Sequence, residues 1–188
     1  MPSLLTYDTL VFRADYPADA HSILDEAGTR VGRVVKDGLV VFDRDDVPLL
    51  AIENVERERK SFYRLDRSAR PVVIVDGRSR VAATILGKHG EINDASGQSL
   101  GAIKVRWRHP RTLVIEDSSG TEAGKLTFDL GNRGEDEPME APTVHLSVTG
   151  HPTSDLRLAM LGFAARSVEI VASEVAAIFE RHHAELPS

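Results

Sequence analysis

Basic side chains are the most concentrated chemistry-bearing groups of this 188-residue chain, and they gather in two segments. Aromatic residues stand among them, with Tyr63 in the first segment and Trp107 in the second. Cations spaced along a chain in this way can meet the phosphates of lipid headgroups or of a nucleic-acid backbone. We therefore expect a basic patch that binds an anionic partner, with seven candidate residues: Arg57, Arg59, Lys60, Lys104, Arg106, Arg108 and Arg111.

The second basic segment reads as a strand whose side chains alternate between two faces. Lys104, Arg106 and Arg108 would then share one face, with Val105 and Trp107 on the other. Residues 57–111 hold thirteen Lys/Arg against five Asp/Glu, although the whole chain has a net charge of −6. This local excess suits a phosphate-bearing partner. The alternative is a solvated barrel wall that carries its charges outward, with Trp107 in the core.

One serine has the spacing of a catalytic nucleophile. Gly97, Ser99 and Gly101 match the Gly-x-Ser-x-Gly pattern of hydrolases, in which a strand precedes the serine and a helix follows it. Here the residues after Gly101 have the pattern of a strand, so Ser99 is interpreted as a turn residue. We expect no catalytic residues and a protein that is not an enzyme.

The sequence predicts neither a metal site nor a cofactor. Residues 43–54 begin like a calcium-binding loop, but Pro48 replaces the central Gly and Asn54 replaces the final Glu. The seven His are scattered, without the i,i+4 spacing that places two imidazoles on one helix face. The chain has no Cys and no Gly-rich phosphate-binding loop.

The element that would organise these residues is a long helix at about residues 154–183. Leu, Ala, Met and Glu dominate it, and no Pro interrupts it. Thr153, Ser154 and Asp155 can cap its first free N–H groups. Its first half is apolar in all directions, which requires burial on every side, and beyond Arg166 it becomes amphipathic.

Charge argues against a membrane-spanning interpretation of this helix. Spanning takes about 20 predominantly apolar residues, whereas the longest uncharged run extends from Leu158 to Ala165. Arg157, Arg166 and Glu169 would lie at membrane depth, where charge is costly. A helix inside a protein core is the better interpretation.

Short strands account for nearly all of the remaining chain. Segments rich in Val, Ile and Leu and bounded by Gly, Asp or Pro predict twelve of them. They are residues 9–13, 22–25, 30–35, 39–43, 49–53, 60–66, 72–76, 80–86, 100–107, 113–117, 125–129 and 143–148.

A repeat links several of these strands into hairpins. The pattern Ile-x-Asp-x-x-Gly-x-x-x-Gly begins at Ile23, Ile92 and Ile115, and residues 41–43 and 74–76 resemble versions without the glycines. The Asp carboxylate can accept backbone N–H bonds across the turn, while the first Gly supplies positive φ. The second Gly, inside the return strand, allows a bulge or close packing.

Hairpins in series and a helix that needs burial together predict the fold. A meander of hairpins tends to close into a barrel, and about twelve strands leave a lumen wide enough for a helix about 10–12 Å across. We predict a mainly β protein in which a closed antiparallel barrel of about twelve strands surrounds a central C-terminal helix. The whole chain, residues 1–188, would form one domain.

The hairpin repeats, followed by residues 150–152 and the apolar helix, resemble the tubby C-terminal-like superfamily over about residues 8–182. That group includes tubby domains, phospholipid scramblases and LURP-one-related proteins. The resemblance implies a twelve-stranded barrel around a helix, with phosphoinositide binding in tubby proteins and lipid movement proposed for scramblases. Two scramblase features are absent, because the chain lacks a cysteine cluster and has no Asp or Glu in residues 143–152. No tubby contact residue can be aligned with a position in this chain.

The expected function is therefore binding of anionic phospholipid headgroups, or of another phosphate-bearing partner, through a basic barrel face. The alternative is a protein-interaction or structural adaptor with no lipid affinity. Expected partners are an anionic membrane surface, contacted peripherally, or a protein. Nucleic acid and a transmembrane segment are not expected. The absence of Cys and of a positively charged leader suggests a cytoplasmic protein, and the many Arg and Ala suit a GC-rich bacterial genome.

Overall fold

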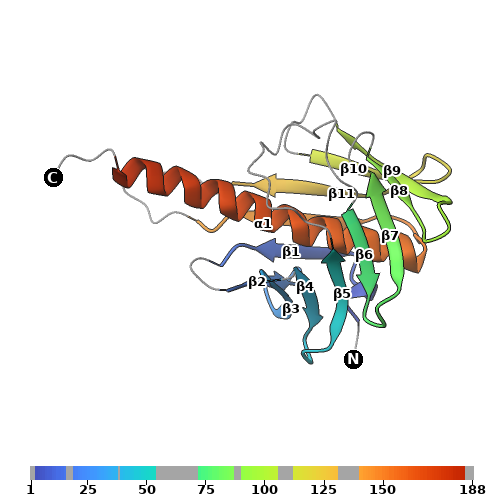
Figure 1. Cartoon of the computed structure of the whole chain (residues 1–188), viewed down its shortest axis with the longest axis horizontal. Helices are drawn as coiled ribbons and strands as arrows, with labels where there is room; N and C mark the ends of the chain where they lie inside the picture. The colour runs from blue at the N-terminus through green and yellow to red at the C-terminus, as the bar shows by residue number, and fades with distance from the viewer. Residues whose placement is uncertain are drawn as a thin grey trace.

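A closed antiparallel barrel of twelve strands surrounds one long helix in this computed structural model (Figure 1). It describes residues 3–15, 19–37, 39–53, 72–86, 90–105, 112–130 and 140–184, with helix side chains as far as Ser173. A short 3-10 helix, η1 (Leu4–Thr6), precedes the barrel. The strands are β1 (Thr9–Arg13), β2 (Ala20–Leu24), β3 (Arg30–Val35), β4 (Val40–Asp43), β5 (Pro48–Glu53), β6 (Val72–Asp76), β7 (Val81–Leu86), β8 (Glu91–Asn93), β9 (Ser99–Val105), β10 (Thr112–Asp117), β11 (Glu122–Asp129) and β12 (Thr143–Val148), and the helix is α1 (Ser154–Ala184).

The predicted fold class is confirmed. Each strand pairs with its neighbours in sequence, and β1 pairs with β12 to close the barrel, with Phe12 opposite Val144. One strand, β8, was not predicted, because three residues give too short a pattern to recognise. The predicted strand at residues 60–66 lies outside the described residues, and β5 pairs directly with β6.

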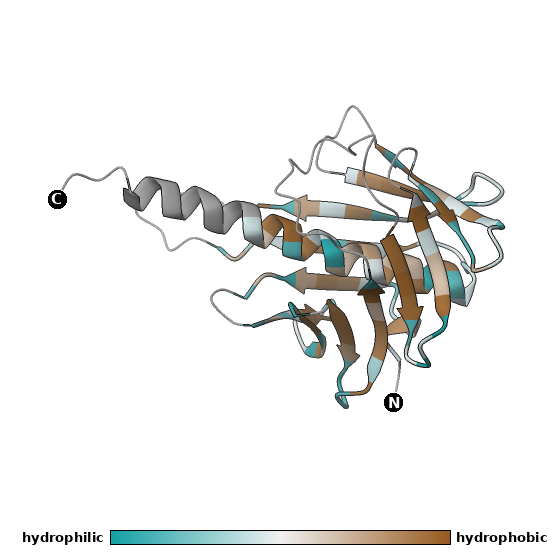
Figure 2. Ribbon diagram, in the orientation of Figure 1, coloured by the Kyte–Doolittle hydropathy of each residue, from teal (hydrophilic) through white to brown (hydrophobic). Residues whose placement is uncertain are grey.

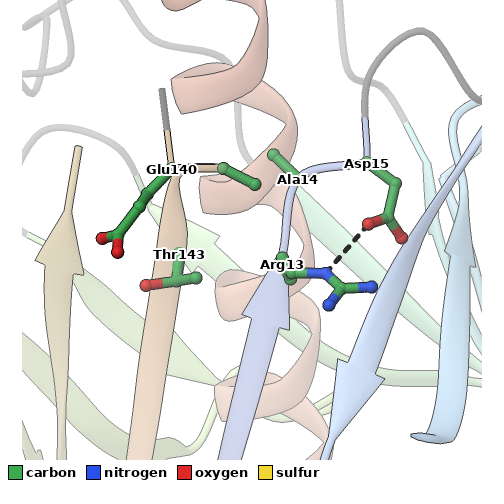
Figure 3. A pocket seen from close by; sticks show the side chains of 6 residues that line it. Arg13, Ala14, Asp15, Glu140 and Thr143 are labelled. Carbon is green, nitrogen blue, oxygen red and sulfur yellow. Dashed lines mark hydrogen bonds and ion pairs between the residues drawn. The ribbon is translucent and has the colours of Figure 1, made fainter. Parts of the chain in front are cut away.

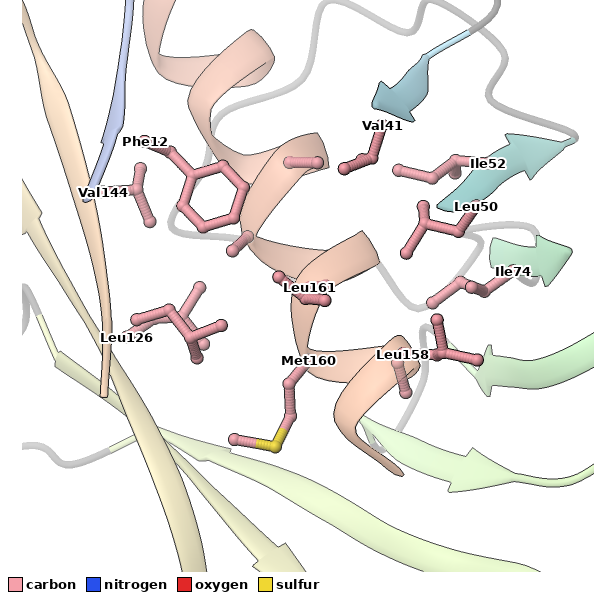
Figure 4. Packing of buried hydrophobic residues seen from close by; sticks show 14 of the residues in the cluster. Phe12, Val41, Leu50, Ile52, Ile74, Leu126, Val144, Leu158, Met160 and Leu161 are labelled. Carbon is pink, nitrogen blue, oxygen red and sulfur yellow. The ribbon is translucent and has the colours of Figure 1, made fainter. Parts of the chain in front are cut away.

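The helix begins where its capping residues predict. The hydroxyl of Thr153 accepts a hydrogen bond from the N–H of Leu156 at 3.3 Å, and its carbonyl accepts one from Arg157. Inside the barrel the helix is buried on opposite sides. Met160 packs against Gly124 of β11, and Gly162 against Ile74 of β6. The barrel interior is therefore one hydrophobic core with the helix at its centre (Figures 2 and 4).

The helix is longer than the barrel that holds it. Its 31 residues span about 46 Å, whereas the longest strand has eight residues, or about 26 Å. Among the helix side chains described, those up to Ser173, the buried ones run from Leu156 to Val171. The C-terminal part of the helix extends past the strands (Figure 1). Within the described ranges, no helical stretch combines the length and the hydrophobicity that a bilayer span requires.

Five turns of one design close the hairpins at one end of the barrel. In each, an Asp carboxylate accepts hydrogen bonds from the backbone N–H groups two and four residues later, at 2.8–3.0 Å. The five residues are Asp25, Asp43, Asp76, Asp94 and Asp117. The turns at Asp43 and Asp76, which lack the repeat's glycines, therefore have the same hydrogen-bond pattern as the other three, as predicted.

The residue three positions after each Asp has positive φ. Glycine provides it in three turns, and Asp46 and Ser79 adopt φ of 60° and 59° in the other two. A shift in strand register immediately precedes each of the five Asp residues. The turn design therefore comes mainly from the Asp carboxylate and the bulge, and glycine lowers the cost of the positive φ.

The Asp76 turn predicts a loss of stability in acid. Backbone and side-chain hydrogen bonds from Arg80 lower the pKa of Asp76 from 3.8 to about 2. A carboxyl whose pKa is lower in the folded state stabilises it above the unfolded pKa, and this contribution disappears as pH falls from about 4 to about 2. Asp76→Asn should show a weaker dependence of unfolding on pH across that interval. NMR titration of the Asp76 carboxyl carbon with a midpoint near 4 would contradict the prediction.

Antiparallel pairing gives the barrel two distinct ends. The five Asp turns and the start of α1 share one end, which we call the turn end. At the other, which we call the helix-exit end, α1 leaves the barrel (Figure 1). Strands β5, β7 and β9 finish at the helix-exit end, and β6, β8 and β10 begin there.

Candidate functional site

His21 of β2 and Glu169 of α1 form a polar pair at the helix-exit end of the barrel. His21 of β2 alternates with outward-facing Ser22, so its ring points inward, where it is completely buried. Its Nε2 lies 2.8 Å from Oε2 of Glu169 on α1. A carboxylate only accepts hydrogen bonds, so Nε2 carries the hydrogen and donates it. The pair links the first hairpin to the helix near the rim.

Glu169 is held in its ionised form. Burial raises its pKa, but the hydrogen bond from His21 and the charges of His21 and Lys36 outweigh burial, so the pKa lies below its ordinary value. The hydroxyl of Ser173, one helical turn later, donates a further bond at 3.3 Å. The negative charge of Glu169 is therefore compensated within its own surroundings.

Arg166 lies one helical turn before Glu169 and has no such compensation. Its side chain is partly buried, and its Nε is buried without a hydrogen-bond partner. No carboxylate of the described residues forms an ion pair with it. Burial lowers the pKa of Arg166 below its ordinary value, because a cation loses hydration there. The helix-exit end therefore holds a cation that no described carboxylate neutralises.

An open groove of about 520 Å³ lies at the same end of the barrel, where β1 ends and β12 begins (Figure 3). Asp15 joins two of its neighbours, accepting hydrogen bonds from Arg13 at 2.9 Å and from Ser22 at 2.5 Å. Glu140 and Thr143 line the other side. The groove carries charges of both signs, so it does not by itself favour an anionic ligand.

Of the seven predicted binding residues, Lys104 is the one that lies within the described residues. Lys104 is exposed near the end of β9, and Ile103 beside it is buried, as strand alternation predicts. Val105 lies on the same face of β9 as Ile103 but is 44% exposed, because β9 ends there. Arg57, Arg59, Lys60, Arg106, Arg108 and Arg111 lie outside the described residues.

Strand order nevertheless relates the two basic segments to each other. Residues 54–71 join β5 to β6, and residues 106–111 join β9 to β10, so the strand ends that they join lie at the helix-exit end. The first segment has six Lys/Arg against three Asp/Glu, and the second has three Arg and no acid. Both are therefore anchored on one arc of the barrel, across strands β5 to β10.

The described residues offer no arrangement typical of a catalytic or metal site. Ser99 begins β9, so a strand follows it where a nucleophile elbow needs a helix. The carboxylate of Asp43 accepts two backbone hydrogen bonds in its own turn, and Asp46 pairs with Arg33. Within the described ranges, no group of three His, Asp or Glu is placed to hold a metal ion.

Sequence reasoning missed the pair of His21 and Glu169. They are 148 positions apart, so no motif spacing connects them. The polar stripe of the helix, with Arg166, Glu169 and Ser173, was visible in the sequence, but its partner on β2 was not. The one sequence signal for His21 is its spacing from Ile23. Residues two positions apart in a strand share a face, so His21 would lie on the same face as a core residue.

Comparisons with known proteins leave the family open. No family model matches the chain, and no curated protein matches it. An X-ray structure of a protein from Arabidopsis thaliana is similar over 90% of this chain and 92% of the other, with 14% identity and a TM-score of 0.48. A likeness at that level carries no argument about function.

Proposed function

We propose that this protein is a non-enzymatic, tubby-like binding module whose helix-exit end takes anionic phospholipid headgroups or another phosphate-bearing group. The main support is topological, because the two basic segments leave the barrel from strands β5, β6, β9 and β10 at the same end. Lys104 is exposed at that end. Side chains from the two segments can then act on one surface, although about 50 positions separate them in sequence.

The filled core supports binding at the surface. Large apolar side chains from opposite walls meet the helix, including Phe12, Leu126, Leu50 and Ile74 (Figure 4). The helix occupies the lumen that a ligand would use in a barrel of the lipocalin kind. A ligand is therefore expected to contact the rim and the outer wall, where a peripheral module meets a membrane.

A vesicle pelleting assay tests this function. The protein should pellet with vesicles of phosphatidylcholine that contain an anionic phospholipid, and less so as salt rises. Each Lys or Arg near such a surface contributes about 1 kcal/mol. The variant R106E/R108E/R111E, which removes three such contributions and adds repulsion, should therefore bind at least about 100-fold more weakly. The control R30E/R44E/R78E makes the same charge change at exposed residues of the turn end and should pellet normally.

Unchanged pelleting of R106E/R108E/R111E would refute the basic surface.

One observation favours the second candidate function, a protein-interaction adaptor. The groove at Arg13, Asp15 and Glu140 carries both charge signs, which suits a polar protein surface better than a uniformly anionic membrane. An adaptor would recover a defined protein partner by pulldown and would not pellet with vesicles at any salt concentration.

A further inference from the structure

We call His21, Lys36, Arg166 and Glu169 the helix-exit cluster. Two buried side-chain atoms of the described residues have no hydrogen-bond partner, and both belong to this cluster. They are Nδ1 of His21 and Nε of Arg166. Glu169 bonds to His21 and follows Arg166 by three positions on α1. Buried polar atoms are nearly always satisfied, so orphaned ones indicate a missing water, ion or ligand.

The charges of the cluster leave a positive excess. Glu169 contributes one negative charge, which already accepts bonds from His21 and Ser173 and lies in the field of Lys36. Arg166 and Lys36 contribute two positive charges, and no carboxylate within the described ranges is paired with Arg166. A partly buried cation without a counter-ion is costly. An anion from outside the chain would remove that cost.

We propose that Arg166 is the anchor of an anion site at the mouth of the barrel, and that this site takes a phosphate group. The choice of phosphate over other anions rests on the proposed function. The guanidinium is planar and presents several N–H donors in a fixed fork, which matches two oxygens of a phosphate. Its side chain is only partly buried, so part of it is accessible to a ligand.

Thermal unfolding with inorganic phosphate tests the site, using potassium chloride of equal ionic strength as reference. Phosphate at about 100 times Kd should raise the Tm of the natural protein by about 5 to 10 °C. Arg166→Met, which removes the charge and keeps the volume, should lose this rise. Its Tm without phosphate should equal or exceed that of the natural protein, because the uncompensated cation is gone.

Two further variants keep the result interpretable. Arg33→Met removes an arginine that pairs with Asp46 at 2.9 Å and stacks on Phe42, and it should keep the full rise with phosphate. Arg166→Lys keeps the charge and loses the planar fork, so its rise should be smaller than that of the natural protein. The site is refuted if phosphate gives no rise beyond potassium chloride, or if Arg166→Met retains the rise.

Competition separates a lipid headgroup from free phosphate. Free phosphate should displace the protein from phosphatidic acid vesicles if the headgroup enters the Arg166 site. A Tm rise that depends on Arg166, without such displacement, would assign the site to a soluble phosphate compound. Failure of the basic surface appears instead as unchanged pelleting of R106E/R108E/R111E, so the two ideas can fail separately.

Discussion

A chain that ends at Gly150 is expected to lose its cooperative unfolding transition. It lacks the helix and with it six large buried apolar side chains: Leu156, Leu158, Met160, Leu161, Val168 and Val171. At about 2 kcal/mol each, these contribute on the order of 12 kcal/mol of burial, which is comparable with the whole net stability of a typical domain, about 5–15 kcal/mol. The inner wall of the barrel would also lose its packing partner. Circular dichroism during urea unfolding should show a broad, sloping change.

A chain that ends at Ser173 is the matched control. It retains every buried helix side chain of the described part, up to Val171, and it retains Glu169 with its bond to His21. Its urea transition should stay sharp. A sharp transition for the chain ending at Gly150 would show that the barrel stands without the helix, and the helix would then not be the element on which the core depends.

Local signals explain why the barrel and its helix could be predicted. The Asp turns involve residues within four positions of one another, so the sequence pattern contains the whole structure of the turn. The helix was recognisable because its apolar residues point in all directions, which only a surrounding wall can satisfy. Together these features determine the alternation of strands and turns and the need for closure around the helix.

Features that depend on long-range pairing could not be predicted in this way. Strand β8 has three residues, and its pairing with β7 and β9 establishes it where its own pattern is too short. The bond between His21 and Glu169 depends on where the helix lies along β2, which sequence spacing does not reveal. The environment of Arg166 is likewise a property of its neighbours. Of the predicted basic residues, Lys104 alone is described, so the basic patch stays a prediction.

Gly101→Val is expected to be strongly destabilising. Gly101 of β9 is the second glycine of its hairpin repeat, and it is buried opposite Asp117 of β10. A Cβ there would overlap the backbone carbonyl oxygen of Glu116, and a backbone atom cannot turn away as a side chain can. Overpacking of this kind costs about 1–3 kcal/mol or more, and the bulk of valine places the effect at or above the upper end. The midpoint of urea unfolding should fall accordingly.

Ala102→Val provides the control for this substitution, one position further along β9. Ala102 is partly exposed and lies on the opposite face of the strand, where a β-branched side chain suits the extended backbone. We expect its unfolding free energy to stay within about 0.5 kcal/mol of the natural value. Equal losses of unfolding free energy in Gly101→Val and Ala102→Val would mean that the inward-facing position tolerates valine as well as the outward-facing one. Close strand packing at the second glycine would then not explain why the repeat carries glycine at this position.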